Sequence, residues 1–172
     1  KQYTTTSHGA RFHVALYDQE SGQMRAMIDA NRLGQIRTGA VTGLASELLA
    51  GKGIDQAGLF GTGWQAESQL EAVVTTCQLA RVNVYSRDKE RRQEFCQRMS
   101  ERLQIDVHPV EEPRLAVEDM PLVITMTTSK SPVFSGDWLA ESSLVCAAGS
   151  NWLQKSELDR DTIEKAELVV CD

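Results

Sequence analysis

A glycine-rich turn constrains the fold of this chain more than any other stretch. Gly61-Thr62-Gly63-Trp64-Gln65-Ala66 follows a short apolar run, 57–60, and precedes a stretch with helical apolar spacing, 66–74. In this order of strand, tight turn and helix, a helix N-terminus faces a bound pyrophosphate. Gly61 permits the turn, Gly63 lets a diphosphate approach the backbone, and Ala66 is small enough for the helix to pack on the strand. The motif indicates a dinucleotide fold; the alternative is a glycine turn that only joins two elements.

The chain after residue 50 alternates between apolar runs and helical or short connections. We expect strands at 57–60, 82–85, 105–110, 122–126, 143–148 and 168–171, and helices at 89–103, 115–118 and 158–166. This alternation predicts an α/β domain over 51–172, with a Rossmann-type, doubly wound parallel sheet of about six strands. Ligands on such sheets lie beyond the carboxyl ends of the strands. The cofactor site should therefore gather the glycine turn with Ser86, Arg87, Met126, Thr127, Thr128, Gly149, Ser150 and Asn151.

The first 50 residues have a different pattern. Residues 1–11 are expected to be extended or loop, and 12–28 alternate as a β-hairpin that cannot cover its own apolar face. A short helix should follow at 30–33, and a second one at 40–50 with Thr38 as its N-cap. Arg37 would then stand just before a helix N-terminus, where its fork can bind a carboxylate; a solvated surface arginine is the alternative.

The end of the second expected parallel strand bears on the choice of cofactor. In NAD-binding folds an acidic residue there holds the ribose, whereas a nearby arginine accommodates the 2′-phosphate of NADP. Here Ser86 and Arg87 come first, with Arg91 and Arg92 following. This order favours NADP(H). NAD(H) stays possible if Asp88 binds the ribose.

Composition excludes several classes of partner. Apolar residues make up 41% of the chain and charged residues 24%, which is typical of a globular protein. The net charge of -6 argues against nucleic acid, and no apolar run approaches the roughly 18 residues of a membrane span. The four cysteines lie far apart in the sequence, so we expect no metal site, and reduced cysteines in a cytoplasmic protein.

Four motifs in order carry a family resemblance: Leu33-Gly34-Gln35-Ile36-Arg37-Thr38-Gly39-Ala40, the glycine turn, Gly149-Ser150-Asn151 and Lys155-Ser156-Glu157-Leu158. Over essentially its whole length the chain resembles the ornithine cyclodeaminase/mu-crystallin family. The resemblance implies a central nucleotide domain and a dimerising, substrate-binding domain formed from both chain ends. Residues 1–50 would be part of the N-terminal contribution, with further chain on both sides and a homodimer as the assembly.

The resemblance also implies residue roles. Arg37 matches the arginine that binds the substrate carboxylate, and Lys1 resembles the active-site lysine. Asn151 falls where the cyclodeaminase branch has a catalytic aspartate, and an asparagine cannot exchange a proton. We therefore expect an NAD(P)-dependent oxidoreductase that transfers hydride at the alpha carbon of an amino acid or imine. The alternatives are ornithine cyclodeaminase, which converts L-ornithine to L-proline with loss of ammonia, and a non-catalytic, NADP-binding crystallin-like protein.

Overall fold

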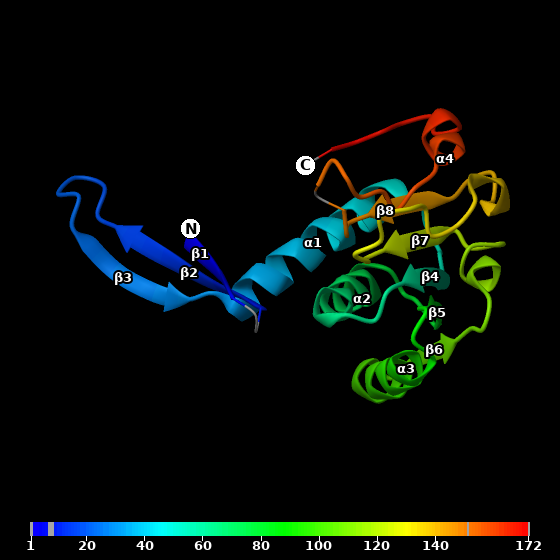
Figure 1. Cartoon of the computed structure of the whole chain (residues 1–172), viewed down its shortest axis with the longest axis horizontal. Coiled ribbons are helices and arrows are strands. Elements are labelled where there is room, and N and C mark those ends of the chain that lie inside the picture. The colour runs from blue at the N-terminus through cyan, green and yellow to red at the C-terminus, as the bar shows by residue number, and fades with distance from the viewer. Residues whose placement is uncertain (1, 7–8, 151, 172) are drawn as a thin grey trace.

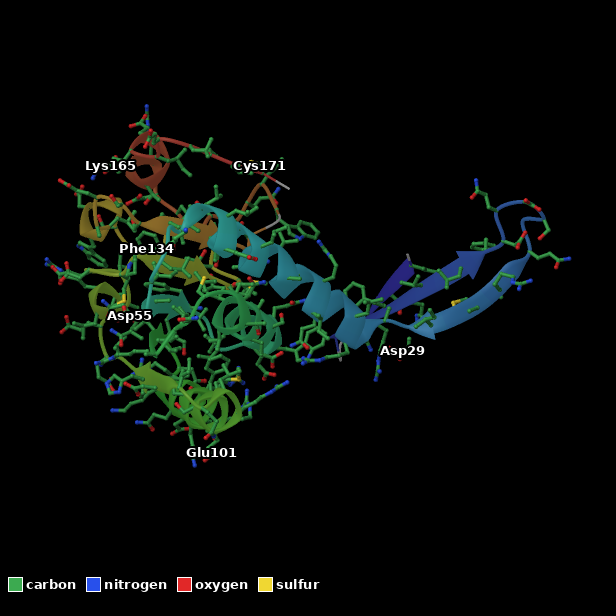
Figure 2. The ribbon with its side chains drawn as sticks, turned by 180° about the vertical axis from the view of Figure 1, so that it is seen from behind. Asp29, Asp55, Glu101, Phe134, Lys165 and Cys171 are labelled. Atoms are coloured by element: carbon green, nitrogen blue, oxygen red, sulfur yellow. The ribbon has the colours of Figure 1, made fainter. Side chains whose placement is uncertain are left out.

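The protein consists of an antiparallel arm and a compact α/β body, joined by one long helix (Figure 1). The computed structural model describes residues 2–6, 9–150 and 152–171. The arm contains β1 (Gln2–Thr6), β2 (Gly9–Tyr17) and β3 (Met24–Asp29) in the order β1-β2-β3. The joining helix is α1 (Asn31–Leu49). Figure 2 shows Asp29 where the arm meets this helix and Phe134 in the body.

The predicted hairpin is confirmed as β2 and β3, and it is extended by a strand that the sequence did not predict. Asp18 accepts hydrogen bonds from the backbone N–H (2.9 Å) and the hydroxyl (2.8 Å) of Ser21 and so fixes the turn, with Gly22 at φ +68°. β1 pairs with β2, Thr4 opposite Arg11. Residues 2–6 show no apolar alternation, so the pairing that makes them a strand is set by β2.

The helix α1 corrects the expected break near residue 38. It runs unbroken for 19 residues, and Thr38 donates its hydroxyl to the Gly34 carbonyl (2.9 Å) instead of capping a new helix. Gly39 and Gly43 lie where α1 packs against a second helix, α2 (Trp64–Thr76). A Cβ on Gly39 would lie 2.2 Å from the Ser68 carbonyl oxygen, so only glycine lets the two helices approach this closely. Arg37 therefore lies inside α1, not before a helix N-terminus.

The body is built on a five-stranded parallel sheet in the order β6-β5-β4-β7-β8. Its strands are β4 (Gln56–Phe60), β5 (Arg81–Tyr85), β6 (Asp106–Pro109), β7 (Leu122–Thr125) and β8 (Leu144–Ala147). The chain winds outward from β4 to β6, returns to place β7 on the other side of β4, and so confirms the doubly wound fold. The sheet has five strands and not six, because residues 168–170 are exposed and join no ladder within the described chain. An apolar run needs a neighbouring strand as well as β propensity.

Long helices cover one face of the sheet, and 3₁₀ turns with a short helix lie on the other side (Figure 1). α2 and α3 (Lys89–Leu103) pack over a core that includes Leu59, Leu70 and Phe95. A second cluster, which includes Phe60 and Phe134, lies on the opposite face. There the expected helix at 115–118 is a 3₁₀ turn, η1 (Pro113–Ala116), and the other elements are η2 (Gly136–Trp138) and α4 (Arg160–Glu164).

Candidate functional site

The glycine turn is held tightly on one side and open on the other. Gly61 has φ +103°, and a Cβ there would lie 2.3 Å from the Met126 carbonyl oxygen, so no other residue fits. Its N–H donates to the Tyr85 carbonyl (3.0 Å), which joins the turn to the end of β5. Gly63 is exposed, and a Cβ there would meet nothing within 4 Å. The open space in front of Gly63 is where a diphosphate could approach the backbone.

The N-terminus of α2 lies at this space, and no side chain caps it. Gly63 is the N-cap and provides no side-chain hydrogen bond to the first turn. Glu67, the acidic residue of that turn, forms ion pairs with Arg98 (2.6 Å) and Arg102 (3.8 Å) of α3. Because its charge is paired on the α3 side, the positive end of the helix dipole remains available to an anion. Ala66 is fully buried, as close packing on the sheet requires.

The end of β5 lies beside the turn. The hydroxyls of Thr62 and Ser86 are 3.4 Å apart, and Ser86 donates to the Asp88 carbonyl (3.1 Å). The Asp88 carboxylate caps α3 by accepting from the Arg91 N–H (3.1 Å), and it also pairs with the Arg91 guanidinium (3.3 Å). Arg87 is exposed. The acidic residue at this strand end is thus already engaged, while the arginine before it faces solvent.

Arg92 is buried behind the end of β5, where its guanidinium is used by protein partners and not available to a ligand. Its side chain is 3% exposed and donates to the Ser86 carbonyl (2.7 Å) and to Glu111 (2.8 Å). The hydrogen bond from Arg92 is the main cause that lowers the pKa of Glu111 below its ordinary value. The sequence could not distinguish the buried Arg92 from the exposed Arg87 and Arg91, because all three lie in one charged segment.

The loops after β7 and β8 are tied together by Glu157, which the sequence analysis named only as part of a family motif, without a role of its own. Glu157 is 2% exposed, and its carboxylate accepts from the N–H and hydroxyl of Thr127 (both 2.6 Å), the hydroxyl of Thr125 (2.9 Å) and the N–H of Gly149 (2.8 Å). Ser150 donates to the Lys155 carbonyl (2.9 Å) and closes the following loop. A buried glutamate outside any regular element has no periodicity signal, so the family motif was the signal that pointed to it, and the fold shows which groups it binds.

The structure gathers most of the predicted cofactor residues at one edge of the sheet. Those brought together beyond the carboxyl ends of β4, β5, β7 and β8 are Gly61, Thr62, Gly63, Trp64, Gln65, Ser86, Arg87, Met126, Thr127, Thr128, Gly149 and Ser150. The predicted catalytic residues Lys1 and Asn151 lie outside the described residues.

Arg37 lies apart from this edge, near the junction of α1 and the arm. It is exposed and lines a pocket of about 230 Å³ together with Val14, Ala30, Leu33 and Gly34. Two residues earlier on the same helix, the buried Gln35 donates its side-chain amide to the Trp64 carbonyl at the start of α2. The helix α1, which carries Arg37, therefore also contacts α2, the helix that follows the glycine turn.

Two thiols are poor candidates for nucleophiles. Burial raises the pKa of Cys96 to about 12 and that of Cys146 to about 11, so both remain protonated near neutral pH. In the part of the chain that the structure describes, no three His, Cys, Asp or Glu side chains converge to hold a metal ion. No helix among these residues has the length and apolar character of a membrane span.

Comparison with known proteins identifies the family. Residues 4–172 match the sequence profile of the ornithine cyclodeaminase/mu-crystallin family. The chain belongs to this family. Δ1-Pyrroline-2-carboxylate reductase from Bacillus cereus is 31% identical over 159 residues, which are 92% of this chain and 49% of that protein. The chain thus spans about half the length of this family member.

Two solved structures of ornithine cyclodeaminase/mu-crystallin type are similar in fold. Thermococcus litoralis Δ1-pyrroline-2-carboxylate reductase, in complex with NADH and L-proline, superposes with a TM-score of 0.87 at 31% identity over 92% of this chain and 49% of that one. An archaeal alanine dehydrogenase dimer with bound NAD superposes with a TM-score of 0.89 at 29% identity over 95% of this chain and 50% of that one. These likenesses extend over the arm, α1 and the body together.

Proposed function

We propose that the protein is an NAD(P)-dependent oxidoreductase that transfers hydride to or from the alpha carbon of an amino acid or imine. The observation that carries this proposal is the open, uncapped N-terminus of α2 behind Gly63, at the carboxyl edge of a doubly wound sheet. The two solved relatives, a reductase bound to NADH and L-proline and a dehydrogenase bound to NAD, support it.

NADP(H) is the cofactor that we propose, with NAD(H) as the alternative. Asp88, the residue that an NAD ribose would need, caps α3 and pairs with Arg91. Arg87 is exposed beside Ser86 and suits a 2′-phosphate. The bound NADH and NAD of the two relatives are the reason to keep NAD(H) in every test.

The substrate would bind between the body and the arm. In this proposal residues 1–50 form part of a substrate and dimerisation domain, and 51–172 form the dinucleotide domain. Arg37, exposed in a pocket where α1 meets the arm, would bind the substrate carboxylate through its fork. Lys1 and Asn151 are proposed as catalytic from the family resemblance, Lys1 to protonate or polarise the reacting group and Asn151 to hydrogen-bond it.

A homodimer is the assembly that the arm supports. Apolar side chains on β2 and β3 are exposed by 40–64%: Leu16, Tyr17, Met24, Met27 and Ile28. Leu16 and Ile28 share one face of the hairpin, and exposed apolar surface of this kind is typical of an interface. The archaeal alanine dehydrogenase relative is itself described as a dimer.

The test is to measure NADPH and NADH consumption by the whole protein with cyclic imines and with 2-oxo acids plus an amine. Turnover with net oxidation of the cofactor is the expected result. L-Ornithine converted to L-proline and ammonia without net cofactor use would support the cyclodeaminase instead. Tight cofactor binding without turnover on any amino acid or imine would support the crystallin-like alternative.

A further inference from the structure

Glu157 is the most deeply buried carboxylate beside the cofactor site, and the proposed mechanism gives it no role. No lysine or arginine of the described residues pairs with it, so its charge is balanced by hydrogen bonds alone. A carboxylate is costly to bury unless such bonds satisfy it. We propose that Glu157 is a positioning residue that holds the nicotinamide half of the cofactor site, an inference that rests on the proposed function.

Both carboxylate oxygens are used, and each one reaches a different loop. Oε1 accepts from the Thr127 N–H and hydroxyl, after β7; Oε2 accepts from the Gly149 N–H, after β8. The Glu157 carbonyl also accepts from the Val133 N–H (2.9 Å). Charge-assisted bonds of this kind are about twice as strong as neutral ones. Glu157 therefore fixes the separation of the two loops.

The contact is too close for any other residue at position 149. A Cβ on Gly149 would lie 2.4 Å from the Thr127 nitrogen and 2.6 Å from Oε1 of Glu157. The glycine and the glutamate together bring the backbones after β7 and β8 into direct apposition. These two loops, from here on the β7–β8 wall, stand at the carboxyl edge of the sheet.

The strand order assigns this wall to the nicotinamide. In doubly wound sheets each half of the sheet binds one mononucleotide, and the halves meet where the strand order reverses. Here that reversal lies between β4 and β7. The glycine turn with β5 serves the adenosine half, and β7 with β8 serves the other half. Glu157 touches only the loops of the second half, so its effect should be confined to that half.

The substitution Glu157→Gln tests the positioning while preserving shape. An amide has one oxygen and one NH₂ group, whereas the site presents a backbone N–H to each carboxylate oxygen. The NH₂ group of the glutamine would therefore oppose the backbone N–H of either Thr127 or Gly149. Two donors cannot bond to each other, so the two loops would separate. Such an unsatisfied buried group weakens the interaction that depends on it.

The experiment compares a whole cofactor with its adenosine half. NADPH and 2′-phospho-ADP-ribose, or NADH and ADP-ribose if the wild type prefers NADH, are titrated by calorimetry into wild type and Glu157→Gln. We expect the dinucleotide to bind about tenfold more weakly to the variant, and the fragment to change by less than about twofold. Equal weakening of both ligands, or no weakening of the dinucleotide, would overturn the inference.

Asp159 provides a matched control two residues away. Its carboxylate also accepts backbone and hydroxyl hydrogen bonds, from Gly136 N–H (2.9 Å) and from Thr162 N–H (2.8 Å) and hydroxyl (2.6 Å), but it joins η2 to α4. Asp159→Asn should leave the ratio of the two affinities unchanged. If Asp159→Asn also weakened the dinucleotide more than the fragment, the effect would be a general structural one and a specific role for Glu157 would be refuted.

A milder variant covers the case in which Glu157→Gln does not fold. Thr125 is fully buried under the site, and Thr125→Val removes one hydroxyl donor to Glu157 at constant volume. The dinucleotide should again lose more affinity than the adenosine fragment, by a smaller factor, and equal losses would contradict the inference.

If wild type binds neither the dinucleotide nor the fragment, the proposed function itself fails. If wild type binds both and no variant separates them, only the positioning role fails.

Discussion

Two arginines five positions apart have opposite environments at the end of β5. Arg87 is exposed beside the glycine turn, whereas Arg92 is buried against the Ser86 carbonyl and Glu111. The sequence could predict a basic strand end and the motif that precedes it. It could not tell which guanidinium faces a ligand, because burial depends on how α3 packs. The same limit applies to Glu157: the sequence placed it in a family motif but could not show that it binds the loops of Thr127 and Gly149, 30 and 8 residues away.

Replacing Arg87 tests the cofactor preference. In Arg87→Ala the affinity for NADPH should fall by about 1–3 kcal/mol while that for NADH hardly changes, because only NADPH carries the 2′-phosphate. Arg92→Met is the control: it should weaken both cofactors alike and lower the melting temperature, since it removes support from the strand end. Fluorescence titration of both cofactors makes the comparison. A wild type that prefers NADH, or equal losses in Arg87→Ala, would exclude the proposed role.

Replacing Arg37 tests the substrate site. Loss of a charge-assisted bidentate contact costs about 2–4 kcal/mol, so kcat/KM of Arg37→Ala should fall roughly 30- to 1000-fold. Arg37→Lys should recover only part of this, because an ammonium group is a point donor. Cofactor affinity should not change in either variant. Steady-state turnover measured beside NADPH titration decides the matter, and unchanged kcat/KM in Arg37→Ala would refute the assignment.

At the scale of elements, glycine was the residue hardest to interpret. The turn at Gly61 was predicted because its spacing matches a known need for a tight approach, and the structure bears this out. Gly39 follows Thr38, which was expected to cap a new helix, yet it lies inside α1 and marks a close approach to α2. In both places the absence of a side chain lets another backbone segment come close. Whether that segment belongs to a turn or to a second helix depends on the tertiary structure, which the local sequence does not show.

Two glycine substitutions in α1 should have opposite effects on stability. Gly39→Ala places a methyl 2.2 Å from the Ser68 carbonyl oxygen and must push α1 away from α2, at a cost of about 1–3 kcal/mol or more. Gly34→Ala meets only the Phe12 ring at 3.9 Å and should stabilise the helix by about 0.5–1 kcal/mol. Urea unfolding of both variants measures the difference. Similar effects of the two substitutions would show that the helices are not in tight contact at Gly39.

For the whole molecule, the order of helices and strands could be predicted from the sequence, but where the run of strands begins and ends could not. The parallel strands and the hairpin follow from apolar spacing, which the chain carries locally. The missing sixth strand and the additional β1 depend on whether a neighbouring strand is present, which spacing does not report. The apolar arm gave the expectation of a second subunit, and its exposed side chains keep that expectation open to test.

A charge placed on the arm should separate the subunits of the proposed dimer. Leu16 and Ile28 lie on one face of β2 and β3 and are 48% and 40% exposed. The double variant Leu16→Glu/Ile28→Glu should be monomeric at micromolar concentration, because burying unpaired carboxylates in an interface is strongly unfavourable. Glu20→Lys, in the exposed hairpin turn, is the control and should remain dimeric. Light scattering measures both, and a monomeric wild type would refute the dimer.

The unbroken course of α1 has a mechanical consequence. Gln35 contacts the start of α2 and Arg37 lines the pocket near the arm, and they stand two residues apart on one rigid rod. A helix advances about 100° per residue, so inserting one residue between them would turn Arg37 by more than a quarter of a revolution relative to Gln35 and α2. A flexible tether would tolerate such an insertion. If Arg37 binds the substrate as proposed, its position along α1 relative to the start of α2 is set by the pitch of this single helix.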